Sequence, residues 1–211
     1  MKVDKFIFLV ILFIIVLSFV TYRQFKGFRK SLSEMELPKL EIPETNLFPS
    51  DQGSSKEFIS PDEKLKLEYS SAWVEMEKEA MVKLNQEMIK KGARILFFGN
   101  KYLSEKATFA SLLIQEINSE GKGIEEIITA MKEDVEKGGD NVTITQLETN
   151  EKEVSLKAEY QREEGTIFTS REKVLLTEGK AYFIAIFSLD IDWPYFEKEA
   201  EEILNSAQIT S

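Results

Sequence analysis

The sequence predicts an α+β fold, in which an antiparallel β-sheet is sandwiched by helices and preceded by a single N-terminal transmembrane helix. Three observations lead to this prediction. An uncharged apolar run covers residues 6–20. The region after residue 61 mixes segments of strand period with segments of helix period. Consecutive strand-like segments with tight turns fill residues 141–189, as is typical of an antiparallel sheet that helices cover.

Residues 6–22 are about as long as the shortest helix that crosses a bilayer core, near 17 residues. A cleaved signal peptide is the alternative. Its apolar region is usually shorter, and small residues precede the cleavage site. Here the segment Ser18-Phe-Val-Thr21-Tyr places large residues at those positions. We therefore favour an uncleaved membrane anchor.

The orientation of this anchor depends on the basic residues around it. They are Lys2 and Lys5 before the run, and Arg23, Lys26, Arg29 and Lys30 after it. The positive-inside rule alone would place the downstream side in the cytoplasm. A short basic N-terminus followed directly by an apolar core, however, resembles a signal anchor that exports the rest of the chain. We expect a single-pass protein of the cell membrane with an extracytoplasmic soluble domain.

The rest of the chain is acidic and lacks two reactive residue types. Residues 31–211 hold 21 basic and 36 acidic side chains, a net charge of −15, which argues against nucleic acid as a partner. The absence of His and Cys excludes disulfides, Ser-His-Asp and Cys-His catalysis, and zinc sites built on these residues. We therefore expect no enzyme. A carboxylate-dependent hydrolase is the alternative, because two carboxyl groups across a cleft suffice for a glycosidase.

Three regions follow from composition. Residues 1–30 are the anchor with its basic flanks, residues 31–60 a linker, and residues 61–211 a domain. Spaced prolines in and beside the linker favour extended chain; they are Pro38, Pro43, Pro49 and Pro61. The domain is long enough to bury about 70% of its unfolded surface.

The first half of the domain predicts two helices and three strands. Residues 65–69 alternate as a strand does, and Trp73 then opens a run of helical spacing that Gly92 ends. Residues 93–98 and 108–115 are rich in β-branched and aromatic residues and predict a strand pair. A second helix follows, with an apolar face formed by Ile124, Ile127, Ile128 and Met131 and a stop at Gly138-Gly139.

The second half predicts a meander that ends in a helix. Its strands cover residues 142–147, 153–160, 166–176 and 181–187. The fourth is apolar nearly throughout, as expected of a central strand buried on both faces. The helix begins near Asp192, whose carboxylate can cap free amide groups. Phe196, Ala200, Ile203 and Leu204 give it an apolar face, and Glu197, Glu199, Glu201 and Glu202 are expected to face mostly outward.

Two segments carry a resemblance to a known family. They are Leu67-Glu-Tyr-Ser-Ser-Ala-Trp73, and Gly179-Lys-Ala-Tyr182-Phe-Ile-Ala followed by Phe196 and Ile203-Leu-Asn-Ser206. With the order of elements, they make residues 61–210 similar to the PsbP family of photosystem II extrinsic proteins and its bacterial relatives, whose fold is shared with the nuclear import factor Mog. The resemblance implies a non-catalytic, extracytoplasmic binding or assembly domain.

The most suggestive side chains lie where the last strand meets the last helix. Asp190 and Asp192 could supply oxygen ligands to a hard cation such as Ca²⁺. The alternative is that Asp192 caps the helix while Asp190 is solvated, and that the protein needs no cofactor. Trp193 and Tyr195 would form a contact surface if their rings are exposed.

Two functions stay open at this point. One is a membrane-anchored domain that binds a protein or small ligand, held in the membrane by residues 6–22. The other is a structural or sensory accessory subunit whose anchor pairs with another membrane protein.

Overall fold

The computed structural model describes residues 53–89, 92–103, 108–119, 121–127, 129, 141–161 and 165–210. The predicted span at residues 6–22, most of the predicted linker and the predicted stop at residues 138–139 lie outside these residues. Within the described residues, no helix has the length and apolar character that a membrane crossing requires.

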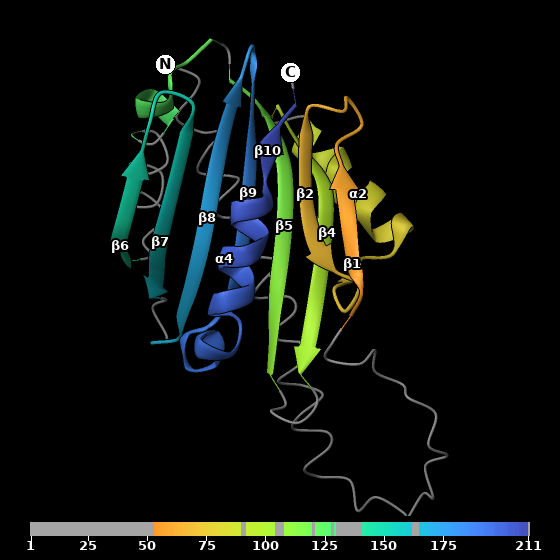
Figure 1. Cartoon of the computed structure of the whole chain (residues 1–211), viewed down its shortest axis with the longest axis vertical. Coiled ribbons are helices and arrows are strands. Elements are labelled where there is room, and N and C mark those ends of the chain that lie inside the picture. The colour runs from red at the N-terminus through yellow and green to blue at the C-terminus, as the bar shows by residue number, and fades with distance from the viewer. Residues whose placement is uncertain are drawn as a thin grey trace, which may run out of the picture.

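A seven-stranded sheet forms the centre of the domain, in the order β3-β4-β5-β9-β8-β7-β6, and all its strand pairs are antiparallel (Figure 1). Its strands are β3 (Val74–Glu75), β4 (Ala93–Leu103), β5 (Thr108–Asn118), β6 (Asn141–Thr149), β7 (Glu153–Gln161), β8 (Ile167–Thr177) and β9 (Lys180–Leu189). The predicted α+β class, the strand pair and the meander are confirmed.

Strand β9 is the middle strand of the sheet, as its apolar sequence predicts. Its residues from 181 to 188 are all buried. A tight turn connects it to β8, because Thr177 pairs with Lys180. Gly179 in this turn has a φ of 78°, a conformation that a side chain would strain. The turn glycine and the apolar strand thus set the register of the meander at its centre.

The two faces of the sheet are covered differently. Helix α2 (Lys78–Ile89) and the helical residues 124–127 pack on one face, around Leu113, Phe183 and Val154. The other face is covered by helix α4 (Glu197–Ser206) and by a small second sheet. That sheet has the order β1-β2-β10, formed by β1 (Ser55–Ile59), β2 (Leu65–Ser70) and β10 (Gln208–Ile209). The sequence predicts a sheet sandwiched by helices alone, but on one face a small second sheet lies beside the helix.

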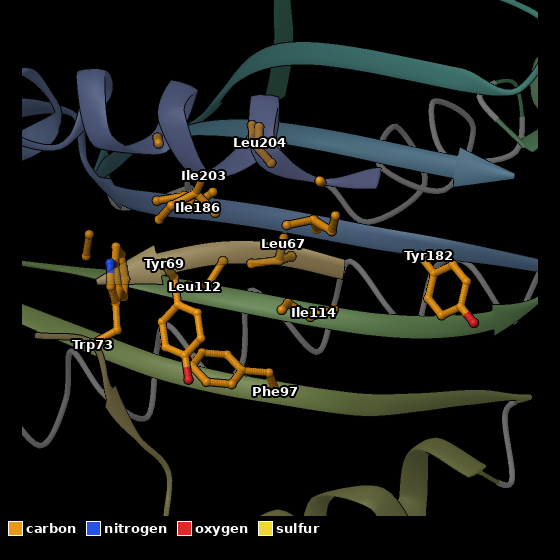
Figure 2. Packing of buried hydrophobic residues seen from close by; sticks show 14 of the residues in the cluster. Leu67, Tyr69, Trp73, Phe97, Leu112, Ile114, Tyr182, Ile186, Ile203 and Leu204 are labelled. Atoms are coloured by element: carbon orange, nitrogen blue, oxygen red, sulfur yellow. The ribbon is translucent and has the colours of Figure 1, made fainter. Parts of the chain in front are cut away.

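Figure 2 shows the core beneath the small sheet and α4. Leu67 and Tyr69 of β2 point toward β4, β5 and β9, and the ring of Tyr69 meets that of Phe97 edge to face with centroids 5.0 Å apart. Ile203 and Leu204 of α4 belong to the same cluster. This core joins both ends of the described chain to the middle of the large sheet.

Two predicted boundaries need correction. Strand β1 lies inside the predicted linker, so the folded domain begins before residue 61. Its side chains are mostly exposed, so the sequence shows no apolar pattern of a strand. Backbone pairing with β2 holds the strand in place instead. The first helix begins at Lys78 and not at Trp73, since Val74 and Glu75 pair with β4. Trp73 is buried in the core under β2.

Candidate contact surface at the junction of β9 and α4

The junction between β9 and α4 is a short 3₁₀ helix, η2 (Asp190–Tyr195). The prediction that the last helix begins near Asp192 is wrong. Helix α4 begins at Glu197, and the N-cap residue, Phe196, makes no capping hydrogen bond with its side chain. Trp193 and Phe196, three residues apart, are both buried in the same cluster. A 3₁₀ turn repeats every three residues and thus brings both rings to the same side.

Contacts with the sheet and a hydrogen bond within the turn hold η2 in place. The Thr169 hydroxyl of β8 donates a hydrogen bond to Asp190 Oδ1 at 2.7 Å. The backbone N–H of Phe196 donates to the carbonyl of Trp193 at 2.9 Å. Lys157 Nζ lies 6.0 Å from the centroid of the Trp193 ring, within the range of a cation–π interaction. The outer side chains of η2 are therefore presented on a fixed backbone.

Two apolar side chains of η2 face outward. Ile191 is 80% exposed and Tyr195 is 52% exposed. Trp193, in contrast, is only 3% exposed, so the prediction that its ring forms a contact surface is wrong. Tyr195 stays a predicted contact residue. Sequence reasoning missed Ile191, although an isoleucine between two aspartates at a strand-to-helix junction was a signal that could have found it.

The predicted cation ligands lie in the same turn. Asp190 accepts the hydrogen bond from Thr169, and Asp192 is partly exposed. Ca²⁺ prefers at least six oxygen ligands. No cluster of three or more acidic side chains suited to a metal occurs in the described ranges. The calcium site at this aspartate pair stays a prediction.

Helix α4 is attached to the sheet by three ion pairs. They are Lys157 with Glu197 (2.6 Å), Lys101 with Glu199 (2.8 Å) and Arg171 with Glu201 (2.7 Å). The expectation that these glutamates face mostly outward is therefore wrong for Glu197 and Glu199, which are only partly exposed. The hydrogen bond from Lys157 lowers the pKa of Glu197. Each of these carboxylates pairs with a basic side chain of the large sheet, and the pairs connect α4, the helix that follows η2, to that sheet.

The first described residues lie at the same end of the domain as this junction. The N–H of Ser71 donates to the carbonyl of Ser54 at 2.8 Å, and a Cβ on Gly53 would lie 2.4 Å from the backbone nitrogen of Ala72. Next to Ala72, the indole N–H of Trp73 donates to Glu199 at 3.0 Å. Glu199 lies in the first turn of α4. The start of β1 and η2 consequently lie toward the same end of the domain, the lower end in Figure 1.

A second polar cluster joins the β1–β2 loop to the opposite end of β9. Asp62 accepts hydrogen bonds from the Tyr182 hydroxyl (2.6 and 2.7 Å), Ser60 Oγ (2.6 Å) and Lys180 Nζ (3.0 Å). Burial raises the pKa of Asp62, but these hydrogen bonds outweigh burial and hold the pKa well below its ordinary value. Lys180 also pairs with Glu116 at 3.0 Å. All these partners lie within the domain, so we assign the cluster a structural role.

A third polar group is buried on the face that α2 covers. Glu172 is 3% exposed, and its Oε1 accepts hydrogen bonds from the hydroxyls of Tyr160 (2.6 Å) and Ser170 (2.8 Å). Among the described residues, its Oε2 has no hydrogen-bond partner. Burial raises the pKa of Glu172, because the two hydrogen bonds do not compensate for the lost hydration. Burial thus shifts the balance at this position toward the neutral acid, compared with a solvated glutamate.

Comparisons with known proteins place this chain among solved structures of low sequence identity. No family model and no curated protein matches the sequence. Cyanobacterial PsbP from Synechocystis is 12% identical with a TM-score of 0.46, and the match covers 84% of this chain and 99% of that one.

Two further structures are similar. LpqN, involved in cell envelope biogenesis of Mycobacterium tuberculosis, is 11% identical with a TM-score of 0.48, covering 75% of this chain and 91% of that one. A protein of unknown function from Pseudomonas aeruginosa, PA94, is 16% identical with a TM-score of 0.42, covering 69% and 90%. The solved structures that resemble this chain thus include PsbP, of the family that its sequence resembles.

Proposed function

We propose that this protein is a membrane-tethered, non-catalytic accessory domain that binds a protein or a small ligand close to the membrane. Residues 6–22 would span the cell membrane, and residues 31–52 would connect this anchor to the domain. The short basic N-terminus before the span supports an extracytoplasmic position of the domain.

One observation carries the proposal. The first described residue, Gly53, lies against the turn that precedes Trp73. The indole N–H of Trp73 in turn donates a hydrogen bond to Glu199 in the first turn of α4. The predicted tether therefore joins the domain at the end where η2 exposes Ile191 and Tyr195. A domain held in this way can bring a partly apolar surface close to the membrane that anchors it.

Two experiments test the proposal. The first fuses either an export-active phosphatase or a cytoplasm-active fluorescent protein to the C-terminus, and we expect activity from the phosphatase fusion alone. Activity from the fluorescent fusion alone would place the domain in the cytoplasm and contradict this part of the proposal.

The second experiment identifies what holds a partner. In one variant an unrelated membrane span replaces residues 6–22, and both chains are extracted in mild detergent with their bound proteins. Partners retained by the exchanged chain support binding by the domain. Partners lost with the native span would instead favour an accessory subunit whose anchor pairs with another membrane protein.

A further inference from the structure

We propose that η2 contacts the lipid bilayer directly, with Ile191 and Tyr195 entering its headgroup region while the rest of the domain stays in water. This inference rests on the membrane anchor of the proposed function and names what the surface of η2 touches.

The exposed side chains of η2 have the chemistry of a membrane interface. Ile191 has the largest exposed fraction, 80%, among the exposed large apolar residues of the described part of the chain. Tyr195 adds an aromatic ring with a polar end, a residue type enriched at the boundary between lipid and water. Pro194 between them is also exposed. An apolar side chain beside an interfacial aromatic residue can enter a headgroup layer without crossing the bilayer core.

The charges around η2 limit how deep this contact can be. Asp190 is exposed and Asp192 partly exposed, and a carboxylate is costly in the hydrocarbon region. The headgroup layer tolerates such charges. The net charge of −15 on residues 31–211 adds a second constraint, because an acidic domain is repelled by an anionic surface. The expected lipid is therefore zwitterionic.

The position of η2 favours a bilayer over other occupants. The proposed tether, residues 31–52, joins the domain at the end where η2 lies, so η2 can reach the membrane that anchors the chain. Stable protein interfaces bury about 800 Å² on each partner, whereas two or three side chains offer roughly 300 Å². A lipid surface needs no shape complementarity and accepts so small a contact.

The chain offers a direct test because it contains no cysteine. Single cysteines are introduced at Phe13 in the predicted span, at Ile191 in η2 and at Ile89 as a control, and each carries a polarity-sensitive fluorophore. Ile89 is a matched control, since it is also largely exposed (60%). It lies at the end of α2 near the start of β4, roughly 25 Å along the sheet from η2.

The labelled full-length chains are inserted into protein-free phosphatidylcholine vesicles. A nitroxide lipid labelled near the headgroup reports contact with the interface, and iodide reports contact with water. We expect the label at 191 to be quenched by the nitroxide lipid and protected from iodide several-fold better than the label at 89. The label at 13 should be protected completely.

Each other outcome has a definite meaning. Labels at 191 and 89 that are equally open to iodide, with the label at 13 protected, would overturn the bilayer contact and leave the anchor intact. A label at 13 that is open to iodide overturns the membrane anchor, and the inference falls with it. Protection at 191 only in native membranes, and not in protein-free vesicles, would mean that a protein covers η2, which also overturns the inference. A last variant, Ile191→Ser, carries the polarity-sensitive fluorophore at position 195 instead. Its fluorescence should lose the spectral shift that membrane contact causes in the chain with Ile191, while the free energy of unfolding stays unchanged.

Discussion

Replacing Tyr182 by phenylalanine removes one hydroxyl from the Asp62 cluster and tests whether that cluster stabilises the domain. Tyr182 is fully buried at 0% exposure, so the phenylalanine ring occupies the same space and only the hydrogen bonds change. The lost hydroxyl lies 2.6 and 2.7 Å from the two oxygens of Asp62. Hydrogen bonds to charged groups contribute about 1.5–3 kcal/mol each. We expect the free energy of unfolding to fall by about this amount near neutral pH.

The pH dependence follows from the lowered pKa of Asp62. A carboxyl group whose folded pKa is below its unfolded value, about 3.9, stabilises the fold above that value. This contribution is lost as the pH falls through the folded pKa. Tyr182→Phe raises the folded pKa of Asp62, because one of the hydrogen bonds to the carboxylate disappears. Because the unfolded states of variant and wild type titrate alike, their difference in the free energy of unfolding should stay constant through pH 4 and shrink only as the pH falls through the folded pKa of Asp62 in the variant.

The assay is urea unfolding of the full-length chain in detergent, followed by tryptophan fluorescence, since Trp73 and Trp193 are both buried in the fold. Tyr69→Phe is the matched control. Its hydroxyl donates to the carboxylate of Glu75 at 3.1 Å, and because Glu75 is exposed and screened by water, the loss of this bond should cost only about 1 kcal/mol. A Tyr182→Phe variant as stable as the wild type at pH 7, or a loss there no larger than that of Tyr69→Phe, would refute the reasoning.

Three further predictions concern other parts of the domain. Glu172→Gln should be as stable as the wild type at pH 4 and more stable at pH 8, because a buried acid with a raised pKa destabilises the fold as the pH rises; urea unfolding at both pH values measures this, and a variant less stable at both would contradict it. Ile203→Ala should lower the free energy of unfolding by about 2–5 kcal/mol, whereas Ile191→Ala should change it by less than about 0.5 kcal/mol; equal effects would show that their burial is misassigned. Lys101→Met removes the partner of Glu199 and should cost about 1–3 kcal/mol, with recovery in a Lys101→Met and Glu199→Gln double variant; an additive loss would argue against the ion pair.

Much of the large sheet could be predicted because its strands carry a period of two or a continuous apolar run. Strand β7 alternates between buried and partly exposed residues, and β9 is buried along its length. Turn chemistry supported these assignments, as at Gly179. Strand β1 could not be predicted, because its side chains are mostly exposed and its pairing with β2 uses backbone groups that leave no pattern in the sequence.

The candidate surface was predicted only in part for a related reason. Sequence placed Asp190, Asp192, Trp193 and Tyr195 at one strand-to-helix junction, and the structure finds them together in η2. Which of the rings faces outward depends on a 3₁₀ turn instead of an α-helical one. That choice follows from the core that Trp193 joins, and a six-residue segment carries too little periodicity to reveal it.

The sequence by itself determined the order of most strands and helices, the exclusion of His and Cys chemistry, and the prediction of an anchor at residues 6–22. Local periodicity and composition suffice for these. The tertiary structure alone decided that β1, β2 and β10 form a second sheet, that Trp193 is buried, and that Ile191 is exposed at the same end of the domain as the start of β1. These features depend on contacts between residues distant in sequence, such as Trp73 with Glu199. Such contacts form only when distant segments pack together, so no single segment of the sequence reveals them.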